Sequence, residues 1–192
     1  METTKQIAQC IGQIFMPLSE QTQEQLASIL VPRELKKGEF FLKEGEVCKQ
    51  IGYIHQGFVR QYYYKNNKDI TEHFAYENYF VMAIESCFNK QPSHMIIEAL
   101  EPTLIYGMPF DRLKELLRKE PEIALLYSAF LEQSLIISQR KTDSLRFETA
   151  TERYFRLMKE HPEIIKRAPL SHIASFLLMT PETLSRVRAN IL

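Results

Sequence analysis

The chain has 192 residues, of which 45% are hydrophobic and 25% are charged. This composition is typical of a folded globular protein and excludes a disordered chain, and the length allows one large domain or two smaller ones. Lys and Arg equal Asp and Glu in number, at 24 each, so the net charge of zero argues against a strongly basic nucleic-acid-binding protein. From residue 140 onward, however, ten basic residues stand against six acidic ones, a charge that suits docking of this end on phosphates.

The location of the protein is indicated by what the sequence lacks. No apolar run is long enough to span a membrane, and the first residues carry no apolar block of a signal peptide. The three cysteines, Cys10, Cys48 and Cys87, are scattered, as expected for reduced thiols. We therefore expect a cytoplasmic protein.

The N-terminal part of the chain predicts helices followed by a β-rich unit. Residues 1–30 show helical spacing, with Ser19 as a cap. From about residue 31, glycines separate six or more short apolar or alternating runs, which indicates antiparallel strands in a roll or barrel. Asn66-Asn67 is expected to form a hairpin turn, because Asn tolerates a positive φ.

After Pro109 the pattern becomes helical again. Residues 110–119 predict a short helix, and residues 122–144 predict a long helix of about 24 residues, which spans roughly 36 Å. Its broad apolar face exceeds what one small roll covers, so we interpret it as a dimerisation helix that links two domains. The residues assigned to the dimer are Ile123, Leu126, Tyr127, Phe130 and Ile137. The alternative is a core helix packed wholly within its own subunit.

Residues 170–187 predict two short helices separated by a tight break. Apolar residues fall on one face of each, namely Ile173, Ala174 and Leu177 in the first and Leu184, Val187 and Ile191 in the second. Thr180-Pro181 is a helix start, because Thr accepts from free N–H groups and Pro loses no donor that the helix needs. The pattern is typical of a helix-turn-helix, although a helical hairpin in any bundle can imitate it.

These segments together resemble the cyclic AMP receptor protein/FNR (Crp/Fnr) family of bacterial transcription regulators. The resemblance rests on the motifs KGEF at 37–40, EGE at 44–46 and IHQGFVR at 54–60, and on ATERYFRLMKEHPEI at 150–164 and IASFLLMTPETLSRVR at 173–188. It implies an α+β fold with a cyclic-nucleotide-binding-like antiparallel β-roll (a double-stranded β-helix or jelly roll) over residues 1–121. A dimerisation helix over 122–145 and a helix-turn-helix domain over 146–192 would follow.

The resemblance also implies which residues read DNA. Family recognition helices place a Glu and, four residues later, an Arg against base edges, and these are Glu182 and Arg186 here. Glu accepts from a cytosine amino group and Arg bonds guanine O6 and N7 together. The neighbouring Thr180, Thr183, Ser185 and Arg188 would then lie near phosphates or adjacent bases. The alternative for the first pair is a surface ion pair. Leu178 replaces the usual turn glycine, so a different turn geometry is expected.

The sensor half departs further from the family. Relatives that bind cyclic AMP hold its phosphate with an Arg, but this chain has no Arg between Arg60 and Arg112. We therefore expect no cyclic AMP binding of the family type and assign no cofactor. An apolar or aromatic effector is the hypothesis that remains for this half. Its pocket would be lined by Phe74, Tyr76, Phe80, Met82, Glu85 and His94, for which the alternative is ordinary core.

The resemblance implies double-stranded DNA, a second copy of the chain and RNA polymerase as partners, and no membrane. No catalytic or metal site is predicted, since the sequence has no phosphate loop, G-x-S-x-G or HExxH motif. The main interpretation is a homodimeric regulator that binds a two-fold symmetric operator. The alternative is a ligand-binding module whose helical end makes protein contacts.

Overall fold

The computed structural model describes residues 3–189, so the predicted core position Ile191 lies outside the described residues. The chain begins with α1 (Thr4–Phe15) and α2 (Glu20–Ile29). Thr3 and Gln6 form a reciprocal capping box at the start of α1, and the Ser19 hydroxyl accepts from the Thr22 N–H at the start of α2. The predicted Ser19 cap is therefore confirmed.

The β-rich unit is a roll of two four-stranded antiparallel sheets, as predicted. One sheet has the order β1-β8-β3-β6 and the other has the order β2-β7-β4-β5. The strands are β1 (Val31–Leu35), β2 (Phe40–Leu42), β3 (Gln50–Gln56), β4 (Val59–Lys65), β5 (Lys68–Ala75), β6 (Phe80–Val81), β7 (Ile96–Ala99) and β8 (Thr103–Pro109), with the short α3 (Ile84–Asn89) between β6 and β7. The core between the sheets is built from fully buried side chains such as Ile54, Ile97 and Ile105.

The hairpin of β4 and β5 forms one margin of the roll. Asn66 and Asn67 both have positive φ, 52° and 60°, which confirms the predicted turn. Because β5 is the last strand of its sheet, one side of its backbone has no partner strand. The C-terminal helices lie against this hairpin.

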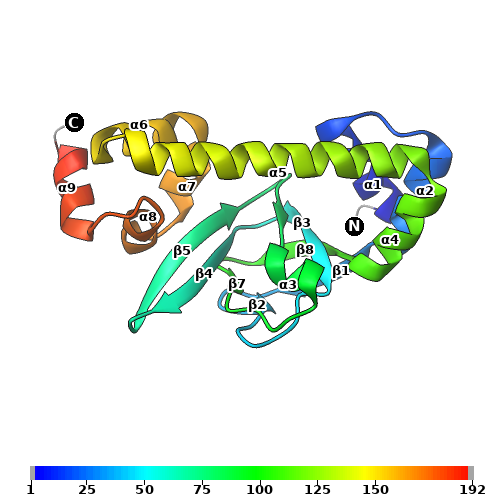
Figure 1. Cartoon of the computed structure of the whole chain (residues 1–192), viewed down its shortest axis with the longest axis horizontal. Helices are drawn as coiled ribbons and strands as arrows, with labels where there is room; N and C mark the ends of the chain where they lie inside the picture. The colour runs from blue at the N-terminus through cyan, green and yellow to red at the C-terminus, as the bar shows by residue number, and fades with distance from the viewer. Residues whose placement is uncertain (1–2, 190–192) are drawn as a thin grey trace.

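A single long helix joins the two ends of the molecule (Figure 1). After α4 (Phe110–Lys119), Pro121 starts α5 (Pro121–Phe147), whose 27 residues correspond to about 40 Å. Its first turns pack into the core of their own subunit, where Ile123 is 0% and Leu126 is 7% exposed. Assigning these two residues to a dimer contact was therefore wrong, because their side chains are already covered by α1, α2 and the roll.

The other residues assigned to the dimer divide between the two interpretations. Tyr127 and Phe130 are partly buried against the same core, and Phe130 packs on Phe15 and Phe80. Only Ile137, at 43% exposed, lies on an open part of the helix. The core-helix alternative thus applies to the first ten residues of α5. The middle of the helix is not covered by the described residues of its own chain.

The C-terminal domain is made of four short helices, α6 (Ala150–Glu160), α7 (Pro162–Arg167), α8 (Leu170–Phe176) and α9 (Pro181–Ala189). The predicted faces are confirmed, since Ile173, Ala174 and Leu177 are buried with Leu184 and Val187 in one cluster. This arrangement is a helix-turn-helix with α8 and α9 as its two helices.

The turn between α8 and α9 differs from the expectation at Leu178. The Met179 N–H donates to the Ala174 carbonyl and the Leu178 N–H to the Ser175 carbonyl, a pairing that defines a Schellman turn. Leu178 has a φ of 50°, the left-handed conformation that glycine would adopt here. The turn geometry is kept, and the expectation of a different one was wrong.

The residues assigned to an effector pocket do not converge. Phe80 and Met82 belong to the core of the roll, while Phe74 packs against the C-terminal domain and Tyr76 contacts His161. Glu85 and His94 are exposed at other places on the surface. The six residues therefore do not form the predicted pocket, because they belong to separate elements that face the core of the roll, the C-terminal domain and the solvent.

Over residues 3–189, the structure contains no helix with the length and apolarity needed to cross a membrane.

Candidate nucleic-acid interface

The helix α9 presents one polar side to the solvent. Leu184 and Val187, at 0% and 7% exposed, anchor its inner side among α6 and α8. Glu182, Ser185, Arg186 and Arg188 are exposed on the helix, Thr180 is exposed just before it, and Thr183 is half-buried. The structure thus brings all six residues predicted to contact DNA to the start or the open side of one helix, which lies at the end of the molecule (Figure 1).

The start of α9 is held by the residues predicted to cap it. The Thr180 hydroxyl accepts from the Thr183 N–H at 3.2 Å, which confirms the predicted cap. The pKa of Glu182 is lowered because its carboxylate accepts from its own backbone N–H and from the Thr180 hydroxyl, with a smaller effect from the charge of Arg186. Glu182 is therefore ionised and turned toward the helix start, one turn before Arg186.

Arg153 of α6 links two elements of the C-terminal part of the chain by hydrogen bonds. Its guanidinium donates to the Leu177 carbonyl at 3.0 Å and to the Glu148 carbonyl at 2.8 Å. One side chain thus ties the end of α8 to the end of α5.

The first helix of the motif, α8, covers the open margin of β5. The Thr71 N–H donates to the Ser175 hydroxyl at 2.9 Å, and that hydroxyl donates to the Asp69 carbonyl at 3.2 Å. Ser175 therefore satisfies backbone groups that an edge strand would otherwise leave open. We call the contacts between the roll and the helices α6, α7 and α8 the docking interface.

A buried arginine closes the docking interface on one side. Arg60 of β4 is 2% exposed, and it donates from Nη1 to Asp69 at 2.6 Å and from Nε to Thr71 at 2.8 Å. The same Nη1 lies 3.2 Å from Nε2 of His172 on α8. The pKa of His172 is lowered, first by burial and then by the positive charge of Arg60, while Asp69 opposes this effect. His172 is therefore neutral at neutral pH and accepts from Arg60.

A second arginine closes the interface from the other side. Arg167 at the end of α7 donates to both carboxylate oxygens of Glu77, at 2.7 and 3.1 Å, and to Glu101 at 2.6 Å. Its guanidinium also lies over the Phe58 ring, 5.0 Å from the centroid. Planar contacts with two carboxylates and an aromatic face are a role that Arg fills and Lys does not.

Aromatic side chains fill the space between these two arginines. Phe58 and Phe74 stack at 5.3 Å, and the Phe176 ring of α8 meets Phe74 edge-on at 5.4 Å. Next to them, the hydroxyls of Tyr76 and Tyr79 lie 3.1 and 3.3 Å from Nδ1 of His161. The docking interface thus has an apolar centre and charged margins, like the interior of one domain.

The comparisons with known proteins agree with this geometry. The family described as the cyclic nucleotide-binding domain matches residues 32–120, which cover the roll and α4. The c-di-GMP responsive global regulator CLP of Xanthomonas campestris has a TM-score of 0.71 at 15% identity, over 90% of this chain and 91% of that chain. FixK2 of Bradyrhizobium japonicum has a TM-score of 0.68 at 18% identity, over 85% and 84%.

A Crp/Fnr-family protein of Eubacterium rectale has a TM-score of 0.67 at 15% identity, over 90% of this chain and 83% of that chain. The chain has the Crp/Fnr regulator fold. The fold predicted from the sequence motifs is thereby confirmed. No curated protein matches the sequence.

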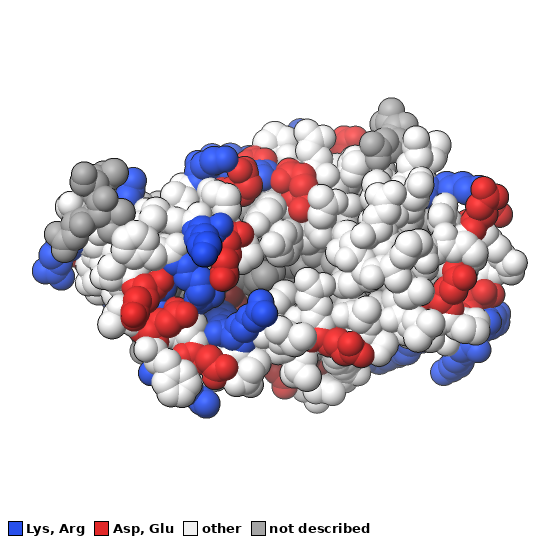
Figure 2. Space-filling view, turned by 90° about the horizontal axis from the view of Figure 1, so that it is seen from above, with Lys and Arg blue, Asp and Glu red and all other residues white. Residues whose placement is uncertain are grey.

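In this Crp/Fnr fold, the middle of α5 exposes an apolar face that the sequence did not locate. Leu135 is 72% and Ile136 is 51% exposed, and neither packs against the roll. Leu125, Ile136 and Phe147 are spaced by 11 residues, about three helical turns, and so lie on one line of the helix. Seen along this side in Figure 2, a broad area without Lys, Arg, Asp or Glu separates charged groups near the two ends.

Sequence reasoning missed the docking interface altogether. Arg60 is part of a family-like motif, and nothing in its sequence context shows that it is buried against a helix more than 100 residues away. Phe74 was assigned to the effector pocket because strand alternation alone does not identify which side of a sheet another domain covers. The one available signal was that Arg60 interrupts an apolar strand segment, which indicates a paired buried charge.

Proposed function

We propose that this protein is a transcription regulator that binds a two-fold symmetric DNA site as a homodimer. The observation that carries the proposal is α9, a helix anchored by Leu184 and Val187 whose open side holds Arg186, Arg188 and Glu182. A helix of this kind fits the major groove of B-DNA, where base edges differ between all four base pairs. The excess of basic residues from residue 140 onward supports the proposal that this end of the molecule contacts the DNA phosphates.

Within α9, the two ionised side chains have different roles. Arg186 can bond O6 and N7 of one guanine together, and we assign it the main base contact. Glu182 accepts from a cytosine amino group once it leaves its own helix start. Thr180, Thr183, Ser185 and Arg188 then position the helix on phosphates or neighbouring bases.

The second part of the proposal is the dimer. Two copies related by a two-fold axis would bury the exposed Leu135, Ile136 and Leu131 of α5 against each other. This contact sets the distance between two recognition helices to about one turn of DNA, roughly 34 Å. RNA polymerase is the further partner expected of a regulator that activates transcription.

The third part concerns the effector. The roll has no Arg between residues 60 and 112, and Arg60 itself is bound to Asp69, Thr71 and His172. A cyclic phosphate in the roll would lack a guanidinium partner. We therefore propose that DNA binding does not require cyclic AMP.

The experiment is a selection of bound duplexes from a random pool by the purified full-length chain, with and without cyclic AMP, at low and at physiological salt. The proposal predicts an inverted-repeat motif whose binding weakens steeply with salt and is unchanged by cyclic AMP. Arg186→Ala should weaken binding to that motif by about 5- to 150-fold, corresponding to about 1–3 kcal/mol for a lost base contact.

The matched control is Arg118→Ala, which removes the same charge from an exposed position on α4 at the other end of the molecule. It should leave the affinity within about twofold. Equal losses in both variants would show that charge alone attracts the DNA. The absence of any enriched motif at low salt would contradict the proposal and favour a module whose helical end contacts protein.

A further inference from the structure

Two cysteines that are 39 positions apart in the sequence meet inside the roll. Cys48 precedes β3 and is 3% exposed, and Cys87 lies on α3 and is 2% exposed. The Cys48 N–H donates to the hydroxyl of Ser86, the residue before Cys87, at 2.9 Å. The two thiols lie close enough for each to shift the pKa of the other. The third cysteine, Cys10, lies on α1 and is half-buried.

The surroundings make the two thiols unequal. The neighbouring Cys87 thiol lowers the pKa of Cys48, burial opposes this effect, and backbone groups of Ala83 and Gln50 add to it, with the Cys48 sulfur 3.4 Å from the Gln50 carbonyl oxygen. The pKa of Cys87 is raised by the neighbouring Cys48 and by burial. Cys48 is therefore the more readily ionised of the two thiols. The thiolate is the nucleophilic form of cysteine.

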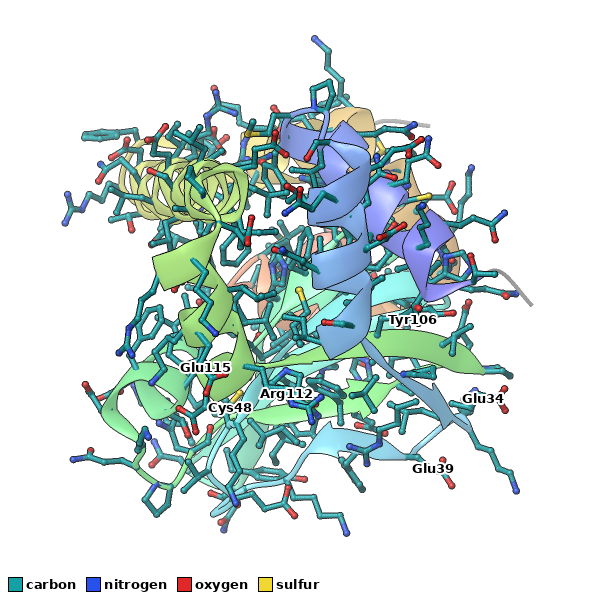
Figure 3. The ribbon with its side chains drawn as sticks, turned by 90° about the vertical axis from the view of Figure 1, so that its right-hand side faces the viewer. Glu34, Glu39, Cys48, Tyr106, Arg112 and Glu115 are labelled. Carbon is teal, nitrogen blue, oxygen red and sulfur yellow. The ribbon has the colours of Figure 1, made fainter. Side chains whose placement is uncertain are left out.

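Cys48 also has a route to the solvent. It contributes to the lining of a surface hollow of about 200 Å³, together with Arg33, Glu46, Lys49 and Gln50. A hollow of this size has room for a hydroperoxide of a few atoms. Figure 3 shows the labelled Cys48 at the end of the roll near which Arg112 and Glu115 of α4 also lie.

We propose that Cys48 and Cys87 are a redox site at which hydrogen peroxide or a small hydroperoxide forms a reversible intrachain disulfide. In the first step, the Cys48 thiolate attacks one peroxide oxygen, the S–O bond forms, the O–O bond breaks, and hydroxide leaves. In the second step, the Cys87 sulfur attacks the sulfenic acid of Cys48, the S–S bond forms, and the S–O bond breaks. The proton of Cys87 leaves with the departing hydroxide as water. Two thiols are thus oxidised while one peroxide is reduced.

The position of the pair links it to the rest of the molecule. Cys87 lies near Tyr127 of α5, whose pKa is raised mainly by burial and to a smaller extent by Cys87, and it lies near Lys114 and Asp111 of α4. A disulfide replaces a contact between α3 and the segment before β3 by a covalent link, at the place where the roll meets the start of α5. This chemistry goes beyond the proposed DNA binding and does not depend on it, so the two can fail separately.

The experiment uses the full chain, reduced under nitrogen, treated with a small molar excess of hydrogen peroxide, and denatured in an alkylating agent. The proposal predicts a chain 2 Da lighter than the reduced form before alkylation, one added alkyl group, at Cys10, after alkylation, and a peptide pair that joins Cys48 to Cys87. Dithiothreitol should restore three alkylated cysteines. Cys10→Ser is the matched control and should form the same link. Cys87→Ser should instead retain a sulfenic acid that dimedone traps at Cys48.

The parent chain alone can overturn the proposal, so the result does not depend on how well a variant folds. Oxidation of Cys48 to sulfinic acid without a link would contradict it, as would a link that involves Cys10. Three free thiols after a treatment that oxidises a small control thiol completely would also contradict it.

Discussion

Leu178 adopts a backbone conformation that glycine accepts freely and leucine does not. The hydrogen bonds of the Schellman turn require the left-handed region at this position, and Leu178 has a φ of 50° there. Its side chain is 53% exposed and recovers little free energy by burial. The left-handed region costs an L-residue about 1–2 kcal/mol, so the turn that orients α9 carries strain.

We therefore expect Leu178→Gly to stabilise the protein. Relief of the left-handed conformation is partly offset by about 0.5–1 kcal/mol for the greater freedom of glycine in the unfolded chain. The net gain should be about 0.5–1 kcal/mol, measured as a rise of roughly 1–4 °C in the thermal midpoint. Leu178→Ala is the control, because it removes the side chain but keeps a Cβ in the left-handed region. A midpoint of Leu178→Gly no higher than that of Leu178→Ala would contradict the strain.

At the scale of the element, α8 serves two partners at once. It is the first helix of the helix-turn-helix, and through Ser175 and His172 it also binds the β4–β5 hairpin. The recognition helix α9 packs on α8, so its orientation depends on how α8 sits on β5. The docking interface thus connects the roll to the nucleic-acid interface in addition to the connection through α5.

The histidine in this interface makes the docking of α8 sensitive to pH. The pKa of His172 in the folded chain lies below the ordinary value of about 6.5, because of burial and the charge of Arg60, with Asp69 acting in the opposite direction. Above pH 6.5, His172 is neutral in both the folded and the unfolded chain, and the full stability is present. As the pH falls below 6.5, the unfolded chain takes up the proton first, so stability is lost down to the folded pKa.

We expect the thermal midpoint of the parent chain to fall more between pH 7.5 and pH 5.5 than that of His172→Gln. Glutamine keeps an acceptor for Arg60 but has no charge to gain. His161 is half-buried beside Tyr76 and Tyr79 and also has a pKa lowered by burial, so His172→Gln should reduce the pH dependence without abolishing it. Equal falls in both proteins would exclude His172 as a source of the pH dependence.

The elements were predicted from the sequence more completely than the contacts between them. Caps and turns at Ser19, Asn66-Asn67 and Thr180 are local, since they depend on residues within four positions of each other. The docking interface joins β4 and β5 to α8 across more than 100 residues, and no local pattern encodes such a pairing. The sequence also predicted which residues of α9 share its exposed side, because helical spacing determines which side chains lie on one face.

At the scale of the whole molecule, α5 changes its environment along its length. Its first turns are core, with Ile123 buried beneath the N-terminal helices, and its last turns contact α6 through Glu148 and Arg156 just beyond its end. Between these turns, Leu135 and Ile136 are exposed to solvent, and no described residue of the same chain covers them. Apolar burial is worth about 25 cal/mol per Å², so a helix with this face gains free energy from pairing with a copy of itself.

This face gives the last prediction, which concerns the oligomeric state. We expect the parent chain to be a dimer by analytical ultracentrifugation and Leu135→Glu to raise its dissociation constant at least about tenfold, or ~1.4 kcal/mol. The reason is that the dimer contact would bury one unpaired carboxylate from each copy, and the two carboxylates would repel each other. Ile84→Glu is the matched control, because Ile84 is 54% exposed on a different helix, α3. It should leave the dimer intact. Two results would contradict a dimer contact through α5: a parent chain that sediments as a monomer, or equal dimer dissociation constants for Leu135→Glu and Ile84→Glu. The apolar middle of α5 would then bind a different partner.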